Sequence, residues 1–419
     1  MTSSPTFKQA ILNKHMLICI FTGFSSGLPL FFLYQLVPGW LRSEGISLAE
    51  IGLFSLIGIP YVWKFVWSPA MDRFQFPFLG RRRGWMLVTQ LFLLLAIGLL
   101  GYLNPVKSIS AIAYIAAAIA FFSASQDIVL DAYRRELLKE HELGLGNSIH
   151  VQAYRLAGLV PGSLGFILAD HLPWHMVFVI VALFMLIGIL MTLCIKEMDS
   201  AANAPKTLEQ AVVLPFKDFI NREGIKSALY ILSFLFLYKL GDSMATALQT
   251  PFFIDMGFSK TEIGVVAKSA SLIAMTIGLA VGGVVMIKLS INRALWLFGV
   301  VQIVSILGFA ALAEIGHNTI ALALAMGFEY LGVGLGTAAF TAFIARATNP
   351  AFAATQFALF TALTALPRTF ANAATGYIVE ITGWTSFFFI CTALAVPGML
   401  MLFKVAPWDQ QSDSKPAQS

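Results

Sequence analysis

Charged residues lie inside long apolar stretches of this 419-residue chain, where they are costly unless they have a function. A charged side chain at the centre of a bilayer costs about 2.5–3.5 kcal/mol. Asp127 lies in the stretch 108–132, and Lys239 and Asp242 lie three apart in 226–253. Further charges inside such stretches are Lys64, Arg155, Lys268, Glu329 and Arg368. Together they predict a polar cavity that could bind an ionic substrate or carry a proton.

Asp127 follows Ser123-Ala124-Ser125-Gln126 and shares a helix face with Asp131, four residues on. Asp131 is closer to the end of the stretch, where it could be interfacial. Asp127 could form a structural ion pair with Arg155 of the next stretch. It could instead couple to protons, because a carboxylate with a movable cation can gain and lose a proton. We expect it to lie within reach of Arg155 or another basic group.

In the second half, the spacing of Lys239 and Asp242 allows them to neutralise each other. That would leave Lys268 as the freer cation for an anionic ligand. Lys64 is close to the end of its stretch and could extend to the membrane interface. We therefore expect Lys268 to contribute more to ligand affinity than Lys64, and Arg368 to contribute if it reaches the cavity.

Composition places these residues in a membrane protein. The chain is 58% hydrophobic and 12% charged, whereas about a quarter of a soluble domain is charged. Its net charge of +5 does not indicate nucleic-acid binding, because the basic residues lie between apolar stretches. The three cysteines, widely separated, have no disulfide or metal-site spacing, and no Ser-His-Asp arrangement predicts an enzyme.

Twelve stretches are long enough to span a bilayer as helices. They are roughly 16–40, 50–70, 85–103, 108–132, 147–170, 174–195, 226–253, 262–287, 293–313, 318–345, 351–378 and 384–404. We predict an all-α protein with a six-helix bundle at 1–195, a cytoplasmic linker at 196–225, a second bundle at 226–404 and a polar tail at 405–419.

The basic residues predict the orientation of these helices. Of the 27 Lys and Arg residues, 19 lie on one side, three lie on the other (Arg42, Lys107 and Lys260) and five lie inside stretches. Because cytoplasmic loops carry the excess of Lys and Arg, both termini are predicted to be cytoplasmic.

The two halves repeat. Gly45-Ile46-Ser47-Leu48-Ala49-Glu50-Ile51-Gly52 matches Gly257-Phe258-Ser259-Lys260-Thr261-Glu262-Ile263-Gly264 at an offset of 257 − 45 = 212. Arg155 and Arg368 are 213 apart, and Trp174 and Trp384 are 210 apart. A parallel repeat of six spans is typical of major facilitator transporters, so we expect the halves to superpose about an axis along the membrane normal.

The loop between the second and third stretches carries a further motif. Asp72-Arg73 is followed by Gly80-Arg81-Arg82-Arg83-Gly84, although extra residues separate the two parts. This resembles the loop signature of the major facilitator superfamily, which implies a cytoplasmic charge latch formed by Asp72, Arg73, Arg81, Arg82 and Arg83. The arginines also fit a plain positive-inside cluster.

Several blocks together resemble the AmpG-type muropeptide permeases of that superfamily. They are Phe24-Ser25-Ser26-Gly27-Leu28-Pro29, Ser123–Ala132, Tyr154-Arg155-Leu156, Leu237-Tyr238-Lys239-Leu240-Gly241-Asp242 and Ala354–Leu359. The resemblance implies proton-dependent import of N-acetylglucosaminyl-1,6-anhydro-N-acetylmuramyl peptides across the bacterial inner membrane, for cell-wall recycling and β-lactamase induction. Some members carry two further C-terminal spans, whereas this sequence ends in a polar tail after the twelfth.

The expected roles follow from the charges and this resemblance. Proton coupling is assigned to Asp127, Asp242 and Glu329. Substrate binding is assigned to Gln126, Tyr154, Arg155, Tyr238, Lys239, Lys268 and Arg368. We expect a monomer in lipid that needs no cofactor beyond the proton gradient. The alternatives are a carrier of another organic anion, such as an acyl-coenzyme A-like molecule, and an intramembrane cell-wall enzyme.

Overall fold

Helices account for the regular structure in a computed structural model of the chain. It describes residues 13–76, 79–139, 142–197, 214–348, 356, 360 and 363–408, and no strand occurs among them. Eleven helical segments in this part are long and apolar enough to cross a membrane. They are Lys14–Ser43, Leu48–Val66, Arg81–Leu100, Pro105–Leu137, Leu143–Ala169, Trp174–Cys194, Ile225–Asp255, Lys260–Val285, Ile291–Ile315, Thr319–Ala347 and Trp384–Val405.

These eleven segments match eleven of the twelve predicted spans, and the all-α prediction is confirmed. The remaining stretch, 351–378, lies partly outside the described residues, although its end forms η9 (Pro367–Ala371), η10 (Asn372–Ala374) and the start of α22 (Thr375–Thr382). Much of the predicted linker also lies outside them. Its described part contains the helix α13 (Leu214–Glu223).

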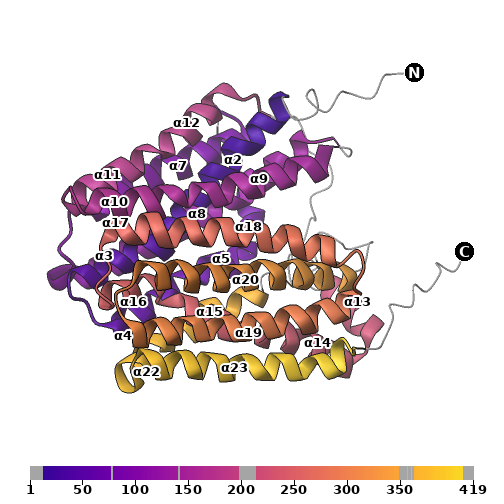
Figure 1. Cartoon of the computed structure of the whole chain (residues 1–419). Helices are drawn as coiled ribbons and strands as arrows, with labels where there is room; N and C mark the ends of the chain where they lie inside the picture. The colour runs from indigo at the N-terminus through magenta and orange to yellow at the C-terminus, as the bar shows by residue number, and fades with distance from the viewer. Residues whose placement is uncertain are drawn as a thin grey trace, which may run out of the picture. The chain divides into compact units, whose positions relative to one another are not determined.

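The chain divides into two units. The first comprises Met1–Ile46, Ile57–Ala204 and Ser259–Gly264, and the second comprises Ser47–Leu56, Pro205–Phe258 and Val265–Ser419. Figure 1 shows the helices of each unit lying roughly parallel to one another. Two short segments therefore belong to a different unit from the rest of their span.

The first unit contains the following elements. They are α2 (Lys14–Phe31), η1 (Phe32–Leu36), α3 (Val37–Ser43), α5 (Ile59–Trp63), η3 (Lys64–Val66), α6 (Ser68–Arg73), α7 (Arg81–Leu100), α8 (Pro105–Leu137), α9 (Leu143–Ala157), η5 (Val160–Leu164), α10 (Gly165–Ala169), α11 (Trp174–Leu183), α12 (Met185–Cys194) and α17 (Lys260–Glu262).

The second unit is built in the same way. Besides α13, η9, η10 and α22 it contains α4 (Leu48–Leu53), α14 (Ile225–Leu237), α15 (Leu240–Ala247), α16 (Gln249–Asp255), α18 (Lys268–Val285), α19 (Ile291–Ile315), α20 (Thr319–Ala347) and α23 (Trp384–Val405). Two elements cross between the units: η2 (Phe54–Gly58) and η7 (Ile263–Ala267).

The repeated Gly-x-Ser-x-x-Glu motif forms the same local structure in both copies. Gly45 and Gly257 have φ angles of +85° and +84°, a region that glycine adopts without a steric penalty. The hydroxyls of Ser47 and Ser259 then accept hydrogen bonds from the backbone amides three residues later, capping α4 and α17. The sequence repeat is thus also a repeat of helix starts.

A distant carboxylate also caps each of these two helices. The Glu380 Oε1 atom accepts a hydrogen bond from the Ala49 amide at 3.0 Å, within the second unit. The Asp170 Oδ2 atom accepts one from the Thr261 amide at 2.6 Å, within the first. The offsets are 380 − 170 = 210 and 261 − 49 = 212 residues, so the two caps are equivalent in the repeat. Carboxylates stabilise helix N-termini because the amides there lack partners.

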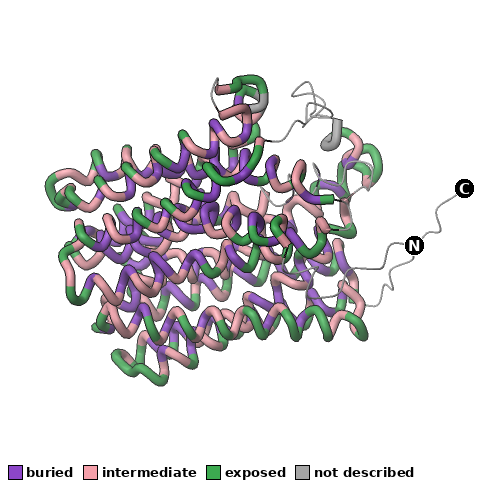
Figure 2. The backbone as a smooth tube through the Cα atoms, turned by 90° about the horizontal axis from the view of Figure 1, so that it is seen from above, coloured by how far each residue is buried: buried purple, intermediate pink, exposed green. Residues whose placement is uncertain are grey.

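Glycines allow close helix packing in both units. A Cβ atom added to Gly27 of α2 would lie 2.3 Å from the Tyr154 carbonyl oxygen of α9. One added to Gly278 of α18 would lie 2.5 Å from the Leu331 carbonyl oxygen of α20. Small residues are the usual means of bringing membrane helices together. Figure 2 shows buried and exposed residues alternating along the helices, so that each helix buries one side.

Candidate functional site

Asp127 lies where three spans of the first unit meet. The Ser26 hydroxyl of α2 donates a hydrogen bond to Asp127 Oδ1 at 2.6 Å. The Lys64 Nζ atom, at the start of η3, lies 3.8 Å from Asp127 Oδ2. The Tyr61 hydroxyl of α5 is buried close to Ser123 and Asp127. We call Ser26, Tyr61, Lys64, Ser123 and Asp127 the Asp127 cluster.

This cluster agrees with the expectation that Asp127 lies within reach of Arg155 or another basic group. Asp127 does lie near a basic group, but its ion-pair partner among the described residues is Lys64 rather than Arg155. Lys64 therefore does not simply extend to the interface, although its side chain remains 34% exposed, against 14% for Asp127. The break between α5 and η3, after Trp63, helps to direct Lys64 towards α8.

Gln126, the neighbour of Asp127, has a packing role here. Its side chain is fully buried, and its amide donates a 2.6 Å hydrogen bond to the Ser25 hydroxyl of α2. Gln90 of α7 also contacts Ser25, and its Oε1 atom accepts a bond from Thr192 of α12 at 2.9 Å. Gln126 thus belongs to a polar link between helices, and its assignment to substrate binding stays a prediction.

The second unit holds a different polar group, centred on Glu329 of α20. Glu329 is fully buried, and its Oε2 atom accepts a 2.7 Å hydrogen bond from the Ser305 hydroxyl of α19. Its carboxyl group also lies in hydrogen-bonding contact with that of Asp242 on α15. The Lys239 Nζ atom lies 3.7 Å from Asp242 Oδ2, so the predicted pairing of these two residues is present. We call Lys239, Asp242, Gln302, Ser305 and Glu329 the Glu329 cluster.

A broken helix positions this cluster. The seventh span consists of α14, α15 and α16, and Lys239 is the residue that precedes the first turn of α15. Interrupted membrane helices commonly form the binding sites of transporters, because their free backbone groups and nearby side chains face protein rather than lipid. Lys239 and Asp242 lie three residues apart at the start of α15, just after the interruption, with side chains only 15% and 14% exposed.

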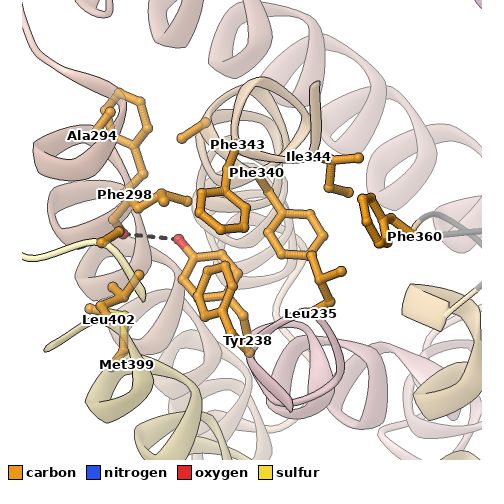
Figure 3. Close-up of a cluster of buried hydrophobic side chains, with 14 of the residues drawn as sticks. Leu235, Tyr238, Ala294, Phe298, Phe340, Phe343, Ile344, Phe360, Met399 and Leu402 are labelled. Carbon is orange, nitrogen blue, oxygen red and sulfur yellow. Dashed lines mark hydrogen bonds between the residues drawn. The ribbon is translucent and has the colours of Figure 1, made fainter. Parts of the chain in front are cut away.

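Tyr238 belongs to the hydrophobic core beside this cluster (Figure 3). Its ring stacks on Phe340 at 5.3 Å between centroids, and its hydroxyl donates a hydrogen bond to the Leu295 carbonyl at 2.9 Å. It is 5% exposed. Both its ring and its hydroxyl are thus engaged in packing, and the assignment of Tyr238 to substrate binding stays a prediction.

The other predicted substrate residues are distributed over both units. Arg155 and Tyr154 lie partly buried on α9, where the Tyr154 ring contacts that of Phe31 at 5.3 Å. Arg368 is exposed on η9, and Lys268 is partly buried at the start of α18. Lys268 takes part in further interactions, so the expectation that it is the freer cation is not supported.

The predicted latch arginines join helix ends within the first unit. The Arg82 guanidinium bonds to Glu136 at the end of α8 at 2.8 Å, and Arg83 donates to the Thr192 and Leu193 carbonyls at the end of α12. Arg81 lies 3.5 Å from Glu136. Arg73 is exposed at the end of α6, and the Asp72 side chain lies outside the described part.

Sequence reasoning missed several members of these groups. Ser26, Tyr61, Ser305, Gln302 and the latch partners Glu136 and Glu197 were not singled out. Glu197 accepts hydrogen bonds from the amides of Arg82 and Arg83 at 2.7 and 2.9 Å and so caps α7. Polar residues inside apolar stretches were the available signal for Ser305 and Gln302, but only the packing of α19 against α20 shows that Ser305 bonds to Glu329.

Comparisons with known proteins agree with this architecture. The chain is 49% identical over 420 residues to an uncharacterised protein of Haemophilus influenzae, covering 98% of this chain and 99% of that protein. It is 43% identical over 387 residues to the anhydromuropeptide permease of Escherichia coli K12, covering 92% of this chain and 78% of the permease. The solved nucleoside transporter NupG matches its fold with a TM-score of 0.73 and 15% identity, over 94% of this chain and 99% of NupG.

A family model completes the comparison. The model described as the Major Facilitator Superfamily matches residues 16–371, which is most of the chain and includes both polar clusters. With its eleven described spans, the protein is a multi-pass membrane carrier. The chain belongs to the major facilitator superfamily.

Proposed function

We propose that this protein imports anhydromuropeptides across the bacterial inner membrane together with protons. The observation that carries the proposal is the 43% identity to the E. coli anhydromuropeptide permease over 92% of the chain. In this role the protein supplies muropeptides for peptidoglycan recycling. The imported muropeptides also provide the signal for β-lactamase induction.

The charges of the spans suit such a substrate. Muropeptides carry sugars, amides and several carboxylates. Arg155 and Arg368 can each bind a carboxylate through two parallel hydrogen bonds, which a lysine cannot do. Lys268 adds a third basic group, and Tyr154 offers an aromatic ring for a sugar. Lys239 serves the substrate less directly, because Asp242 already pairs with it.

Uptake into proteoliposomes tests the proposal. We expect labelled anhydromuropeptide to accumulate when an inward proton gradient is imposed and to stop accumulating when a protonophore removes it. Arg155→Ala should weaken binding of peptides that carry carboxylates more than that of the disaccharide alone. Lys107→Ala, at an exposed position in the first turn of α8, is the matched control and should behave as the unchanged protein.

Competing substrates separate the alternatives. Excess unlabelled muropeptide should abolish uptake, whereas an acyl-coenzyme A should not compete. Competition by the acyl-coenzyme A alone would assign the protein to another class of organic anion. The muropeptide recovered from inside the proteoliposomes should be chemically identical to the one added. Chemical conversion of the muropeptide would indicate an enzyme instead.

A further inference from the structure

The Glu329 cluster brings two carboxyl groups into contact in the interior of the second unit. Glu329 on α20 and Asp242 on α15 are in hydrogen-bonding contact. Glu329 Oε1 and Asp242 Oδ1 are both buried, and neither has a donor from another residue in the described structure. The other oxygen of each is engaged, by Ser305 at 2.7 Å and by Lys239 at 3.7 Å. The two remaining oxygens are therefore left for each other.

Two ionised carboxylates cannot share such a site, because like charges in contact repel strongly where water is excluded. One proton between them converts the repulsion into a hydrogen bond, as in other carboxyl pairs. Lys239 supplies one positive charge, which balances one carboxylate. Lys239, one carboxylate and one carboxyl together are neutral, so the geometry accommodates a single proton.

We propose that Asp242 and Glu329 form the proton-binding site of the transporter and hold one exchangeable proton between them. The proposal deepens the proposed function, because it chooses this pair over Asp127 as the site of coupling. No covalent bond forms or breaks apart from the O–H bond, and the proton comes from and returns to water.

A small cavity beside Asp242 provides room for that water. It has a volume of about 10 Å³, close to the minimum for one molecule. Tyr238, Asp242, Gly299, Gln302 and Met399 are among its lining residues. Gln302 is 4% exposed, and its Nε2 atom has no hydrogen-bond partner in the described structure. A water here would accept from Gln302 and donate to Asp242, satisfying two buried groups and reaching the pair.

Among the described residues, Lys239 is the cation that forms an ion pair with these acids. Tyr330, the neighbour of Glu329 on α20, is close to both acids and to Arg368. The Tyr330 hydroxyl donates to Gln249 Oε1 at 3.0 Å, and Cys391 of α23 is buried nearby. Loss of the shared proton would leave the cluster with a net negative charge, which the second unit must then compensate by rearranging or by binding a cation.

The partners of Asp127 differ from those of Glu329 in charge. It meets a single lysine and a hydroxyl donor, and both stabilise its ionised form without a proton. Asp127 is then a positioning residue that joins α8 to the second span. This contrast predicts opposite behaviour of the two acids when each is replaced by its amide.

Two measurements on the full-length protein test the proposal. Infrared difference spectra between acidic and alkaline buffer report protonated carboxyl groups without any substrate. We expect the carboxyl band to be present in the unchanged protein, lost in Glu329→Gln and shifted in Ser305→Ala, which removes a hydrogen bond to Glu329. Asp127→Asn is the matched control and should retain the band.

Transport provides the second measurement. Glu329→Gln should lower gradient-driven accumulation of anhydromuropeptide to the equilibrium ratio while exchange of internal for external substrate continues. Asp127→Asn should slow uptake but keep its response to the gradient. Retention of both the band and gradient-driven accumulation in Glu329→Gln would overturn the proposal, as would loss of the band in Asp127→Asn. If the band behaves as expected but no muropeptide is transported, the proton site stands and the proposed substrate fails.

Discussion

The two units share their framework but differ in their polar clusters. Both use a Gly-x-Ser-x-x-Glu helix start, a distant carboxylate cap and glycines at close helix contacts. In the first unit, however, Asp127 pairs with a lysine that is 34% exposed. In the second, the fully buried Glu329 meets another acid. The repeat thus maintains the helix arrangement, whereas the buried charges have diverged.

The partner of an intramembrane carboxyl group, rather than its depth, therefore decides whether the group needs a proton to be neutral. An acid beside a lysine forms a neutral pair and can hold helices together. An acid beside a second acid requires a proton for the same neutrality. The shared framework and the divergent clusters can be tested separately.

The largest expected effect concerns the shared glycine contacts. Gly27→Ala and Gly278→Ala each place a Cβ atom against a backbone carbonyl that cannot move away cheaply. We expect each to lower the free energy of unfolding by about 1–3 kcal/mol. Gly283→Ala, on the same helix as Gly278 but with no atom within 4 Å of the added Cβ, is the control. Equal melting temperatures for Gly278→Ala and Gly283→Ala in detergent would contradict the packing role.

A smaller effect separates the two clusters. Asp127→Asn leaves Lys64 without its carboxylate. We expect the free energy of unfolding to fall by about 1–2 kcal/mol, and not by more, because Lys64 reaches solvent. Glu329→Gln keeps the shape, can accept from Ser305 and can donate to Asp242, so it should change stability by about 0.5 kcal/mol or less. Thermal unfolding of the two variants measures the difference. An equal loss in both would show that Glu329 makes an interaction that its amide cannot replace, and the contrast between the clusters would fail.

The same ion pair can be examined with a double substitution. Lys64→Ala should destabilise the protein about as much as Asp127→Asn, and the double variant should lose less than the sum of the two. Strict additivity would show that the two side chains do not interact, and the contrast between the clusters would then disappear.

The smallest effect concerns the carboxylate caps, which the repeat predicts to be equivalent. Asp170→Ala and Glu380→Ala each remove an acceptor from the first turn of a helix. Because both carboxylates are exposed, we expect each substitution to lower the free energy of unfolding by about 0.3–1 kcal/mol, and by less when salt is added. Unfolding measured at low and high salt checks this. A large effect in one variant only would show that the caps are not equivalent.

The class of protein, all eleven described spans and the repeat could be predicted from the sequence alone. These follow from local quantities: the length of apolar stretches, the charge of the loops and the residues that begin helices. The Gly45 and Gly257 motifs, Trp174 and Trp384 each begin corresponding elements in the two halves for this reason. The pairing of Lys239 with Asp242 was also accessible, because both lie within one helical turn.

Contacts between side chains that are distant in the sequence could not be predicted in the same way. Asp127 was expected to lie near Arg155 or another basic group, and the structure shows Lys64, at the start of η3, in that place. Tyr238 was assigned to substrate binding, and the structure shows its ring on Phe340 and its hydroxyl on the Leu295 carbonyl. Glu329 and Asp242 are 87 residues apart (329 − 242), and no periodicity encodes their contact. Helix rotation and crossing decide such contacts, and these depend on packing along the whole interface.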